Sequence, residues 1–360
     1  MTTPTGKDPE PETAGGGRPE RGHAEHGRPA AGGEGCEGTR PMPSKTTHPL
    51  RLFSGSSNRP LAASVARELE THLGGCTTTR LPDTETHVML DDSVRGDDVV
   101  IIQPCSAPVN EHLVELLFYV DAFRRASVHS ITAVVPYFPY ARQERMARGR
   151  ESISAKVVAT MLEALGTSRV VFVDVHAAAI QGFFNIPVDP LSAVSVLCQG
   201  VREKVPLGDA VVVAPDAGRV KLAGQYANAL GIPLVLMHKR RTSFSRAITT
   251  HVVGDIRDRV PIVIDDIIAG GSVLEQLEAL TEAGARPEIY LAITHGVLTP
   301  TALQRLERPE IRELLITDSI ALTPERAHPK IRVCSIAKLL ARVIQRIHEG
   351  SSLGDLMERF

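Results

Sequence analysis

The sequence lacks the features that would place the chain in a membrane or outside the cell. No apolar run approaches the roughly 20 residues of a membrane-spanning helix, and no apolar segment of signal-peptide length stands near the amino terminus. The five cysteines are an odd number, lie far apart and form no C-x-x-C pair, so they indicate neither a disulfide framework nor a zinc site. We therefore expect a soluble protein of the reducing cytoplasm, with no membrane partner.

An excess of charge of one sign is also missing. The formal net charge is −2 at pH 7, from 40 Lys and Arg against 42 Asp and Glu. A chain with so little net charge has no overall attraction for a polyanion, so any anion must be bound by a local cluster of cations. Nucleic acid is not an expected partner.

The first 48 residues differ in composition from the rest of the chain. Residues 1–48 are rich in Gly, Pro, Glu and Arg and have almost no large apolar side chains, so we expect a disordered tail. From residue 49 onward, short β-branched runs alternate with helical patterns. Buried strands are expected at DVVIIQP from Asp98, SITAVVPY from Ser130, RVVFVDV from Arg169, AVVVAPD from Ala210 and VPIVIDD from Val260.

Helical spacing of apolar residues separates these runs. One helix is expected around Leu113 to Val120, another after Asp266 that ends at Gly284, and a last one before Gly350. This alternation predicts an α/β fold of two doubly wound, mostly parallel sheets. A break in the pattern at residues 182–193 divides the chain. The predicted parts are a tail at 1–48, an N-terminal α/β domain at 49–193, a C-terminal α/β domain at 194–345 and a C-terminal segment at 346–360.

Acidic and metal-competent side chains follow three of the predicted strands. Asp174 and His176 follow the third run, Asp216 follows the fourth, and Asp265 with Asp266 end the fifth. Because a parallel sheet exposes its carboxyl strand ends along one edge, these groups could converge on one magnesium-phosphate site. Each has a simpler explanation as well: a turn or core histidine, a helix-capping Asp216, and a plain turn at the acidic pair.

Glycines follow the acidic pair and strengthen the functional interpretation. Asp265 and Asp266 could hold the hydroxyls of a ribose, while Gly270, Gly271 and Ser272 let backbone N–H groups surround a phosphate. The pattern predicts a sugar-phosphate site at this turn.

Two basic segments remain open to two interpretations each. PYARQERMARGRES, from Pro139, has four arginines and no apolar periodicity, so it is either a solvated loop or a mobile lid over phosphate oxygens. HKRR, residues 238–241, follows the predicted strand IPLVLM. It is either a surface turn or a source of cations for phosphoryl transfer.

Taken together, these segments resemble the ribose-phosphate pyrophosphokinase family from Phe53 to the carboxyl terminus. The likeness rests on FSGSSN from Phe53, SVRGDDV from Ser93, NEHLVELL from Asn110, PYARQ from Pro139, SAKVVA from Ser154, IQGFFNIPVD from Ile180 and THG from Thr294, in the family's order and spacing. It implies two domains of the type I phosphoribosyltransferase kind, ATP and ribose 5-phosphate as substrates, and Mg²⁺ as cofactor. It also implies a homo-oligomer, a hexamer in this family, with ATP near the junction of the domains and often between subunits.

The resemblance also implies a role for each matching position. The metal ligands would be His176 and Asp216. The residues at ATP would be Asp83, Glu85, Arg142 and Gln143. Lys239 and Arg241 would stabilise the transition state on a mobile loop. The ribose 5-phosphate site would consist of Asp265, Asp266, Gly270, Gly271 and Ser272. The implied reaction moves the β,γ-diphosphate of ATP to the anomeric hydroxyl of ribose 5-phosphate, giving PRPP and AMP.

The chain departs from the family pattern at four places. The loop after the acidic pair reads AGGSV where the family has D-T-A-G-T, and Arg219 replaces the second glycine of PD-x-GG. Leu81 replaces an aromatic residue that stacks on adenine, and Gly149 replaces a serine in a loop linked to phosphate and ADP control. A second hypothesis is therefore a catalytically weak homologue that regulates a true synthetase. A phosphoribosyltransferase, the third, would not need Arg142 and Gln143.

Overall fold

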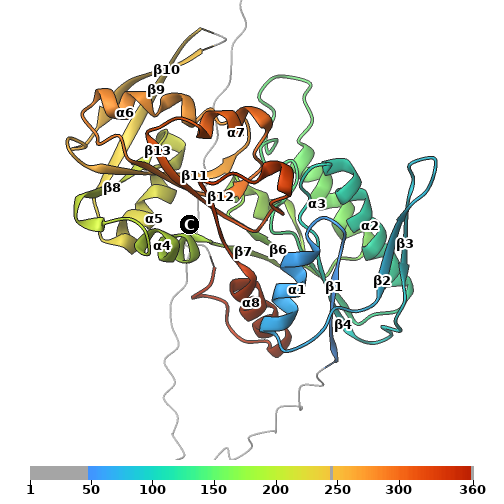
Figure 1. The fold of residues 1–360 in the computed structure, drawn as a ribbon. Coiled ribbons are helices and arrows are strands. Elements are labelled where there is room, and N and C mark those ends of the chain that lie inside the picture. Colours follow the sequence, from blue (N-terminus) through green and yellow to red (C-terminus); the bar gives the residue numbers. More distant parts are fainter. Residues whose placement is uncertain (1–47, 244–245, 358–360) are drawn as a thin grey trace, which may run out of the picture. The chain divides into compact units, whose positions relative to one another are not determined.

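The structure, a computed structural model, describes residues 48–243 and 246–357. The tail predicted at residues 1–48 lies outside this part of the chain, except for His48. The first sheet has five parallel strands in the order β1-β4-β5-β6-β7 (Figure 1). Their bounds are Leu50–Ser54, Asp98–Ile102, Ser130–Val134, Arg169–Val173 and Val188–Leu191. The strands predicted at Asp98, Ser130 and Arg169 are confirmed.

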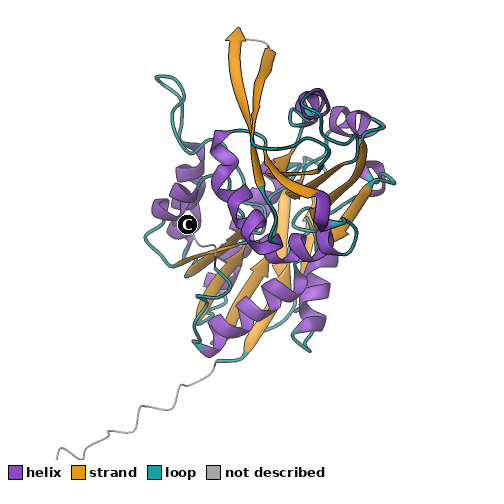
Figure 2. Cartoon of the chain, turned by 90° about the vertical axis from the view of Figure 1, so that its left-hand side faces the viewer, coloured by secondary structure: helices purple, strands orange, loops and turns teal. Residues whose placement is uncertain are grey.

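Helices cover both faces of the first sheet (Figure 2). Side chains alternate across a strand, so Leu52 and Val100 face α1 (Arg59–Glu68) and α8 (Ala337–Glu349), which join them in one apolar cluster. Phe53 and Val99 belong to the opposite cluster, with α2 (Val109–Arg125) and α3 (Ser154–Leu165). A hairpin of β2 (Cys76–Arg80) and β3 (Thr86–Leu90) stands beside α2 (Figure 1). A sheet covered on both faces needs the continuous apolar runs seen in the sequence.

The second sheet has seven strands in the order β10-β9-β8-β11-β12-β13-β14. Within the described residues of this sheet, only the β9–β10 pair is antiparallel. The bounds in chain order are Ala210–Ala214, Leu234–Ser243, Arg246–Val253, Val260–Ile268, Ile289–Gly296, Ile311–Thr317 and Ile331–Cys334. The chain moves from β8 outward to β9 and then returns to β11 on the other side of β8. Ligands of open α/β sheets bind at such a reversal, at the carboxyl ends of the strands.

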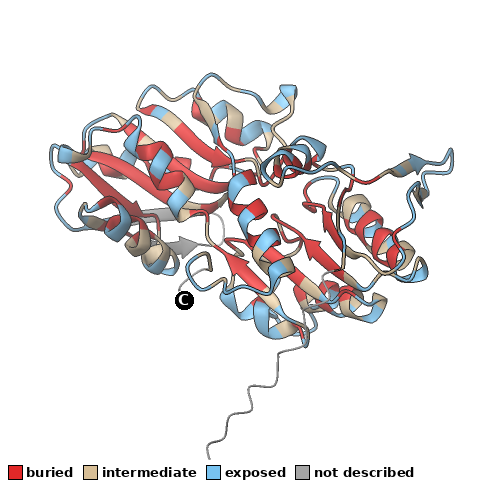
Figure 3. Ribbon diagram, turned by 90° about the horizontal axis from the view of Figure 1, so that it is seen from below, coloured by how far each residue is buried: buried red, intermediate tan, exposed pale blue. Residues whose placement is uncertain are grey.

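The second sheet is also covered on both faces. α4 (Val194–Arg202) and α5 (Val220–Leu230) pack on one face. The 3₁₀ turn η4 (Leu274–Gln276), α6 (Glu278–Glu282) and α7 (Pro300–Leu306) pack on the other. The strands of both sheets are therefore buried, and exposed residues concentrate on loops and outer helix faces (Figure 3).

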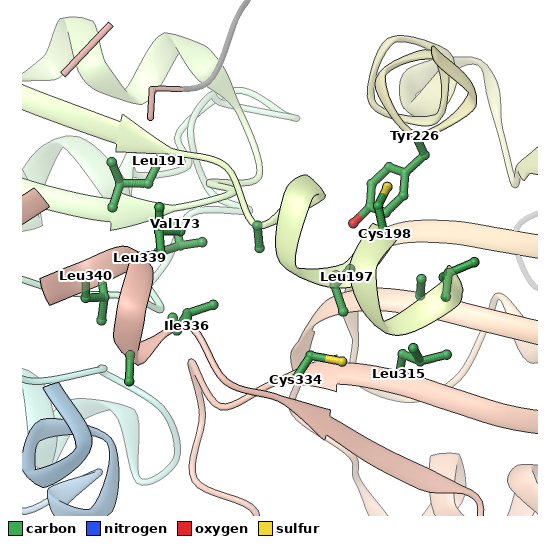
Figure 4. Packing of buried hydrophobic residues seen from close by; sticks show 14 of the residues in the cluster. Val173, Leu191, Leu197, Cys198, Tyr226, Leu315, Cys334, Ile336, Leu339 and Leu340 are labelled. Carbon is green, nitrogen blue, oxygen red and sulfur yellow. The ribbon is translucent and has the colours of Figure 1, made fainter. Parts of the chain in front are cut away.

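One apolar cluster is shared by the two sheets (Figure 4). Ile336, Leu339 and Leu340 of α8 and its amino-terminal flank belong to it, with Val173 from the first sheet and Leu315 from the second. α8 follows β14 of the second sheet but packs against α1 on the first. The limit predicted at residue 345 thus falls inside α8, and contacts group both sheets into one unit, Thr46–Phe360.

Several elements end elsewhere than expected. β11 continues to Ile268 because its pairing with β12 continues, so Asp265 and Asp266 lie within the strand. HKRR extends β9 to Ser243, where pairing with β10 prolongs the strand that was expected to end before it. The helix expected after Asp266 is divided into η4 and α6, and Gly284, at φ +92, follows it as predicted. In the described ranges, no helix combines the length and apolarity needed to cross a bilayer.

Candidate functional site

The carboxyl end of β6 in the first sheet meets the ends of β11 and β12 in the second. Thr294 of β12 donates a hydrogen bond to the carboxylate of Asp174, directly after β6. His295 Nε2 lies 3.0 Å from the carbonyl oxygen of Val173, and its Nδ1 lies 2.8 Å from Ser319 Oγ. A carbonyl can only accept, so Nε2 has the proton and Nδ1 accepts from Ser319. Burial lowers the pKa of His295, which favours this neutral ring.

Asp174 is a buried carboxyl group at this junction. Its side chain accepts from the backbone N–H of Ala193 at 3.2 Å as well as from Thr294. Burial raises the pKa of Asp174 to about 6, although these hydrogen bonds favour the charged form. The side chain therefore connects the two sheets, and it also lines a pocket of about 130 Å³ beside His176.

The adjacent acids of β11 form a compact charged group with a histidine and an arginine. His176 Nδ1 lies 2.7 Å from Asp266 Oδ2. Arg219 Nε lies 3.1 Å from Asp265 Oδ1, and Arg219 Nη2 lies 3.2 Å from Asp266 Oδ1. Burial raises the pKa of Asp265, and the charge of Asp266 adds to this. Burial acts on Asp266 in the same direction, but His176 and Arg219 outweigh it and hold the pKa of Asp266 below its ordinary value.

His176 Nδ1 lies between a hydrogen-bond donor and a hydrogen-bond acceptor. Arg219 Nη2 lies 2.9 Å away and can only donate, whereas Asp266 can only accept. We assign the proton to Nδ1, because a carboxylate is the stronger partner. Nε2 then has a free lone pair, which is how a carboxylate prepares a histidine to bind a metal.

Three pockets meet at His176 and Asp266. Their volumes are about 450, 130 and 240 Å³, and both residues line all three. Eight predicted site residues line the 240 Å³ pocket: Arg142, His176, Asp216, Asp265, Asp266, Gly270, Gly271 and Ser272. Gln143 lines the 450 Å³ pocket, which Arg142 also borders. Asp216, the acids of β11 and the AGGSV loop come from the reversal between β8 and β11, whereas Arg142, Gln143 and His176 follow β5 and β6 of the first sheet.

The AGGSV loop is held by its carbonyl groups. Thr299 Oγ1 donates to the oxygen of Ala269 at 3.0 Å, and Arg305 donates to the oxygen of Gly270. Gly271 has φ +73, a left-handed conformation that glycine adopts without strain. Within the described part of the chain, the backbone N–H groups of Gly271 and Ser272 make no hydrogen bond. Such a turn suits an anion.

Asp216 follows β8 and caps the turn that comes next. Its Oδ1 accepts a hydrogen bond from the backbone N–H of Gly218 at 2.9 Å. Capping, the simpler explanation of Asp216, therefore accounts for one of its two carboxylate oxygens. No three His, Cys, Asp or Glu side chains in the described ranges are grouped to enclose a metal. Mg²⁺ needs only one or two carboxylates when it arrives with substrate phosphates. His176 and Asp216, the two predicted metal ligands, both line the 240 Å³ pocket.

Two other predicted residues, Asp83 and Glu85, are not among the described residues that line these pockets. Asp83 and Glu85 lie exposed in the turn between β2 and β3, where Asp83 Oδ1 accepts from the N–H of Glu85 at 3.2 Å. Lys239 and Arg241 lie in β9, and their backbones pair with Thr249 and Ala247. Their side chains lie outside what the structure describes.

Some lining residues had no predicted role. Tyr137 and Asn110 line the 450 Å³ pocket together with His295, whose ring lies 5.2 Å from that of Tyr137. Tyr137 follows β5, so the rule that ligands bind beyond strand ends would have found it. Arg219 was noted as a departure from the family pattern. Its ion-pair partners, Asp265 and Asp266, lie far along the chain, so no local pattern predicted these contacts.

Comparison with known proteins identifies the family. The N-terminal domain of ribose phosphate pyrophosphokinase matches residues 50–166, and the phosphoribosyl synthetase-associated domain matches residues 247–358. A ribose-phosphate pyrophosphokinase of Bacillus caldolyticus is 43% identical over 312 residues, which are 86% of this chain and 98% of that protein. The chain belongs to the ribose-phosphate pyrophosphokinase family.

Other members of the family agree in sequence and fold. The ribose-phosphate pyrophosphokinase of Thermotoga maritima is 43% identical over 310 residues, 85% of this chain and 98% of that protein. The crystal structure of phosphoribosylpyrophosphate synthetase from Mycobacterium smegmatis aligns with a TM-score of 0.79 and 40% identity. That alignment covers 84% of this chain and all of that one, so the predicted α/β fold is the fold of the family.

Proposed function

We propose that this chain is an active ribose-phosphate pyrophosphokinase, which transfers the β,γ-diphosphate of ATP to ribose 5-phosphate with Mg²⁺. The observation that supports it most is the 240 Å³ pocket, which combines acids, a glycine loop and two arginines. The larger pocket shares His176 and Asp266 with it, so two phosphorylated substrates can meet at a common wall. No finding on the described residues favours a regulatory subunit.

Ribose 5-phosphate suits the smaller of these two pockets. The N–H groups of Gly271 and Ser272, which make no hydrogen bond with the described residues, would bind the 5-phosphate. The carboxylates of Asp265 and Asp266 would accept hydrogen bonds from the ribose hydroxyls, which fixes the sugar ring. This arrangement needs no threonine side chain, so AGGSV can replace the D-T-A-G-T loop of the family.

ATP suits the 450 Å³ pocket. Arg142 would contact phosphate oxygens, because it borders both pockets, and Gln143 would contact the nucleotide. Gln143 is held by Ser154, whose hydroxyl donates to its side-chain oxygen at 2.7 Å. In-line transfer depends mainly on such positioning and on fixed positive charge.

Mg²⁺, held by His176 and Asp216, would neutralise charge on the transferred diphosphate. We assign the remaining cations to Lys239 and Arg241, at the end of β9, next to β8 in the second sheet. Their contribution would be greatest when charge passes to the AMP leaving group.

The proposal includes a homo-oligomer, which in this family is a hexamer. Asp83 and Glu85 lie away from the pockets, which supports their contacting ATP in a second copy of the chain. The proposed compartment is the cytoplasm. The four cysteines of the described ranges are free thiols, which a reducing compartment maintains.

The test is direct observation of the products. Purified protein with ATP, ribose 5-phosphate and Mg²⁺ should form AMP and PRPP, followed by phosphorus NMR, and EDTA should abolish both. Formation of ADP alone, or of no product, rejects the proposal. Lys239→Ala should lower kcat far more than it changes KM if the side chain acts mainly in the transition state. An equal loss in substrate binding would contradict that role.

A further inference from the structure

Arg219 forms ion pairs with both acids that we assign to the ribose hydroxyls. Its Nε lies 3.1 Å from Asp265 Oδ1, and its Nη2 lies 3.2 Å from Asp266 Oδ1. The side chain of Arg219 is 17% exposed and that of Asp266 is 4% exposed, so water screens the second pair poorly. The guanidinium is thus the charged partner of two neighbouring carboxylates.

The oxygens of these two carboxylates already have protein neighbours. Asp265 Oδ1 accepts a hydrogen bond from the N–H of Asp266 at 2.9 Å, and Asp266 Oδ2 lies 2.7 Å from His176 Nδ1. Asp266 Oδ1 is buried and makes no hydrogen bond with the described residues, although it forms the ion pair with Arg219. A sugar hydroxyl would bind such an oxygen by donating to it. It can reach this buried acceptor only if a neighbouring group moves.

Arg219 is the neighbour that has room to move. It lines the 240 Å³ pocket together with both acids and the AGGSV loop. It also lines the pocket of about 130 Å³, where Lys221 and Leu222 form part of the wall and a displaced side chain has space. The family pattern has a glycine at this place, so the guanidinium is an addition of this chain to the site.

We propose that Arg219 competes with the sugar hydroxyls for the carboxylates of Asp265 and Asp266, so that ribose 5-phosphate engages both acids only after the guanidinium moves away. The inference rests on the proposed function, because it takes the 240 Å³ pocket as the sugar-phosphate site. A charged donor binds a carboxylate more strongly than a neutral hydroxyl does. This chain should therefore gain less affinity from the sugar hydroxyls than its two acids would otherwise allow.

The test measures how much a sugar hydroxyl contributes to binding. Ribose 5-phosphate and 2-deoxyribose 5-phosphate are titrated separately into the purified full chain by isothermal titration calorimetry, without ATP. Both ligands have the same phosphate, so the ratio of their dissociation constants separates the contribution of the hydroxyl from that of the charge in the pocket.

The Arg219 variants should change this ratio. Arg219→Gly, which introduces the residue of the family pattern, should raise the preference for ribose 5-phosphate roughly tenfold, the worth of one charge-assisted hydrogen bond. Arg219→Lys should give an intermediate ratio, since one ammonium cannot bridge both acids as a guanidinium does.

Lys221→Ala is the matched control. It removes one positive charge from the lining of the adjoining pocket without touching the ion pairs. A change in net charge acts on the phosphate that both ligands share, so the ratio should stay within about twofold. Equal rises for Arg219→Gly and Lys221→Ala would overturn the inference. An unchanged ratio in the folded Arg219 variants, or no binding of ribose 5-phosphate to any of these proteins, would overturn it as well.

Two further measurements separate the possible failures. Circular dichroism and thermal melting establish whether each variant is folded, and Arg219→Lys serves as the test if Arg219→Gly does not fold. If the unaltered protein forms no PRPP but the ratio rises in the Arg219 variants, the proposed function fails and the competition is supported. If PRPP forms and the ratio is unchanged, the proposed function stands and the competition is overturned.

Discussion

Thr294, on β12 of the second sheet, donates a hydrogen bond to the carboxylate of Asp174, at the end of β6 in the first sheet. The neighbouring His295 contacts the carbonyl oxygen of Val173 at 3.0 Å, so two consecutive residues connect the same pair of sheets. His176 stands two positions after Asp174 and reaches Asp266 on β11. The geometry of the site therefore depends on side chains that have no assigned part in the chemistry.

Asp174 should make stability depend on pH. Its pKa is about 6 in the folded chain, raised by burial from the ordinary 3.8, so the folded state holds the proton more tightly than the unfolded state. The resulting stabilisation is complete below about pH 4 and is lost as pH rises through 6. Relative to Asp174→Asn, the unaltered protein should lose on the order of 3 kcal/mol of unfolding free energy between pH 4 and 7.

Urea unfolding in EDTA at both pH values measures this difference. Asp255→Asn, at an aspartate whose side chain is 75% exposed, is the control and should show no comparable trend. Parallel pH profiles for Asp174→Asn and the unaltered protein would refute the assignment.

The arginines of the 139–152 segment should contribute unequally. Arg142 borders the two larger pockets, whereas Arg148 lines none of the three described ones. Arg142→Ala should raise the KM for ATP roughly tenfold, the worth of one charge-assisted hydrogen bond. Arg148→Ala removes the same charge from the same segment and should leave the KM within about twofold, as expected for a screened charge. Steady-state kinetics at saturating ribose 5-phosphate compares the two variants. Equal increases in the KM for ATP would indicate that the net charge of the segment matters and not the position of Arg142.

Two helical glycines should respond oppositely to alanine. A Cβ on Gly200 of α4 would lie 2.6 Å from Cys334 Sγ and 2.9 Å from Leu315 Cδ2, whereas one on Gly224 of α5 would meet none of the described residues within 4 Å. Gly200→Ala should therefore cost about 1–3 kcal/mol through overpacking. Gly224→Ala should gain roughly 0.5–1 kcal/mol, because alanine is the better helix former. Denaturant unfolding measures the change in unfolding free energy for each variant. A destabilised Gly224→Ala would contradict the open space that the structure shows at Gly224.

The contact of α8 with the first sheet should be important for stability. Leu340 is fully buried in the cluster shared by the two sheets. Leu340→Ala should lower the unfolding free energy by about 2–5 kcal/mol, from lost burial and the cavity left behind. Lys338→Ala, on the exposed side of the same helix, should stay within about 0.5 kcal/mol. If both substitutions changed the unfolding free energy by similarly small amounts, the contact of α8 would contribute little to stability.

Local patterns were sufficient for elements whose signal lies within a few residues. The runs at Asp98, Ser130, Arg169, Ala210 and Val260 became strands because both faces of each sheet are covered, which demands uninterrupted apolar residues. The ends of strands were less predictable. β9 and β11 run longer than expected because a neighbouring strand continues to pair with them, and no local pattern records the length of a partner.

The sequence by itself determined the fold class, the family and the residue types available for a sugar-phosphate site, since each of these follows from composition, spacing or motif order. The tertiary structure alone decided which of these residues meet. Arg219 and Asp266 are separated by nearly fifty positions, and they become an ion pair because β8 and β11 are adjacent at the reversal of the second sheet. Contacts between distant residues depend on strand order, which reflects the packing of whole elements and not the chemistry of any one segment.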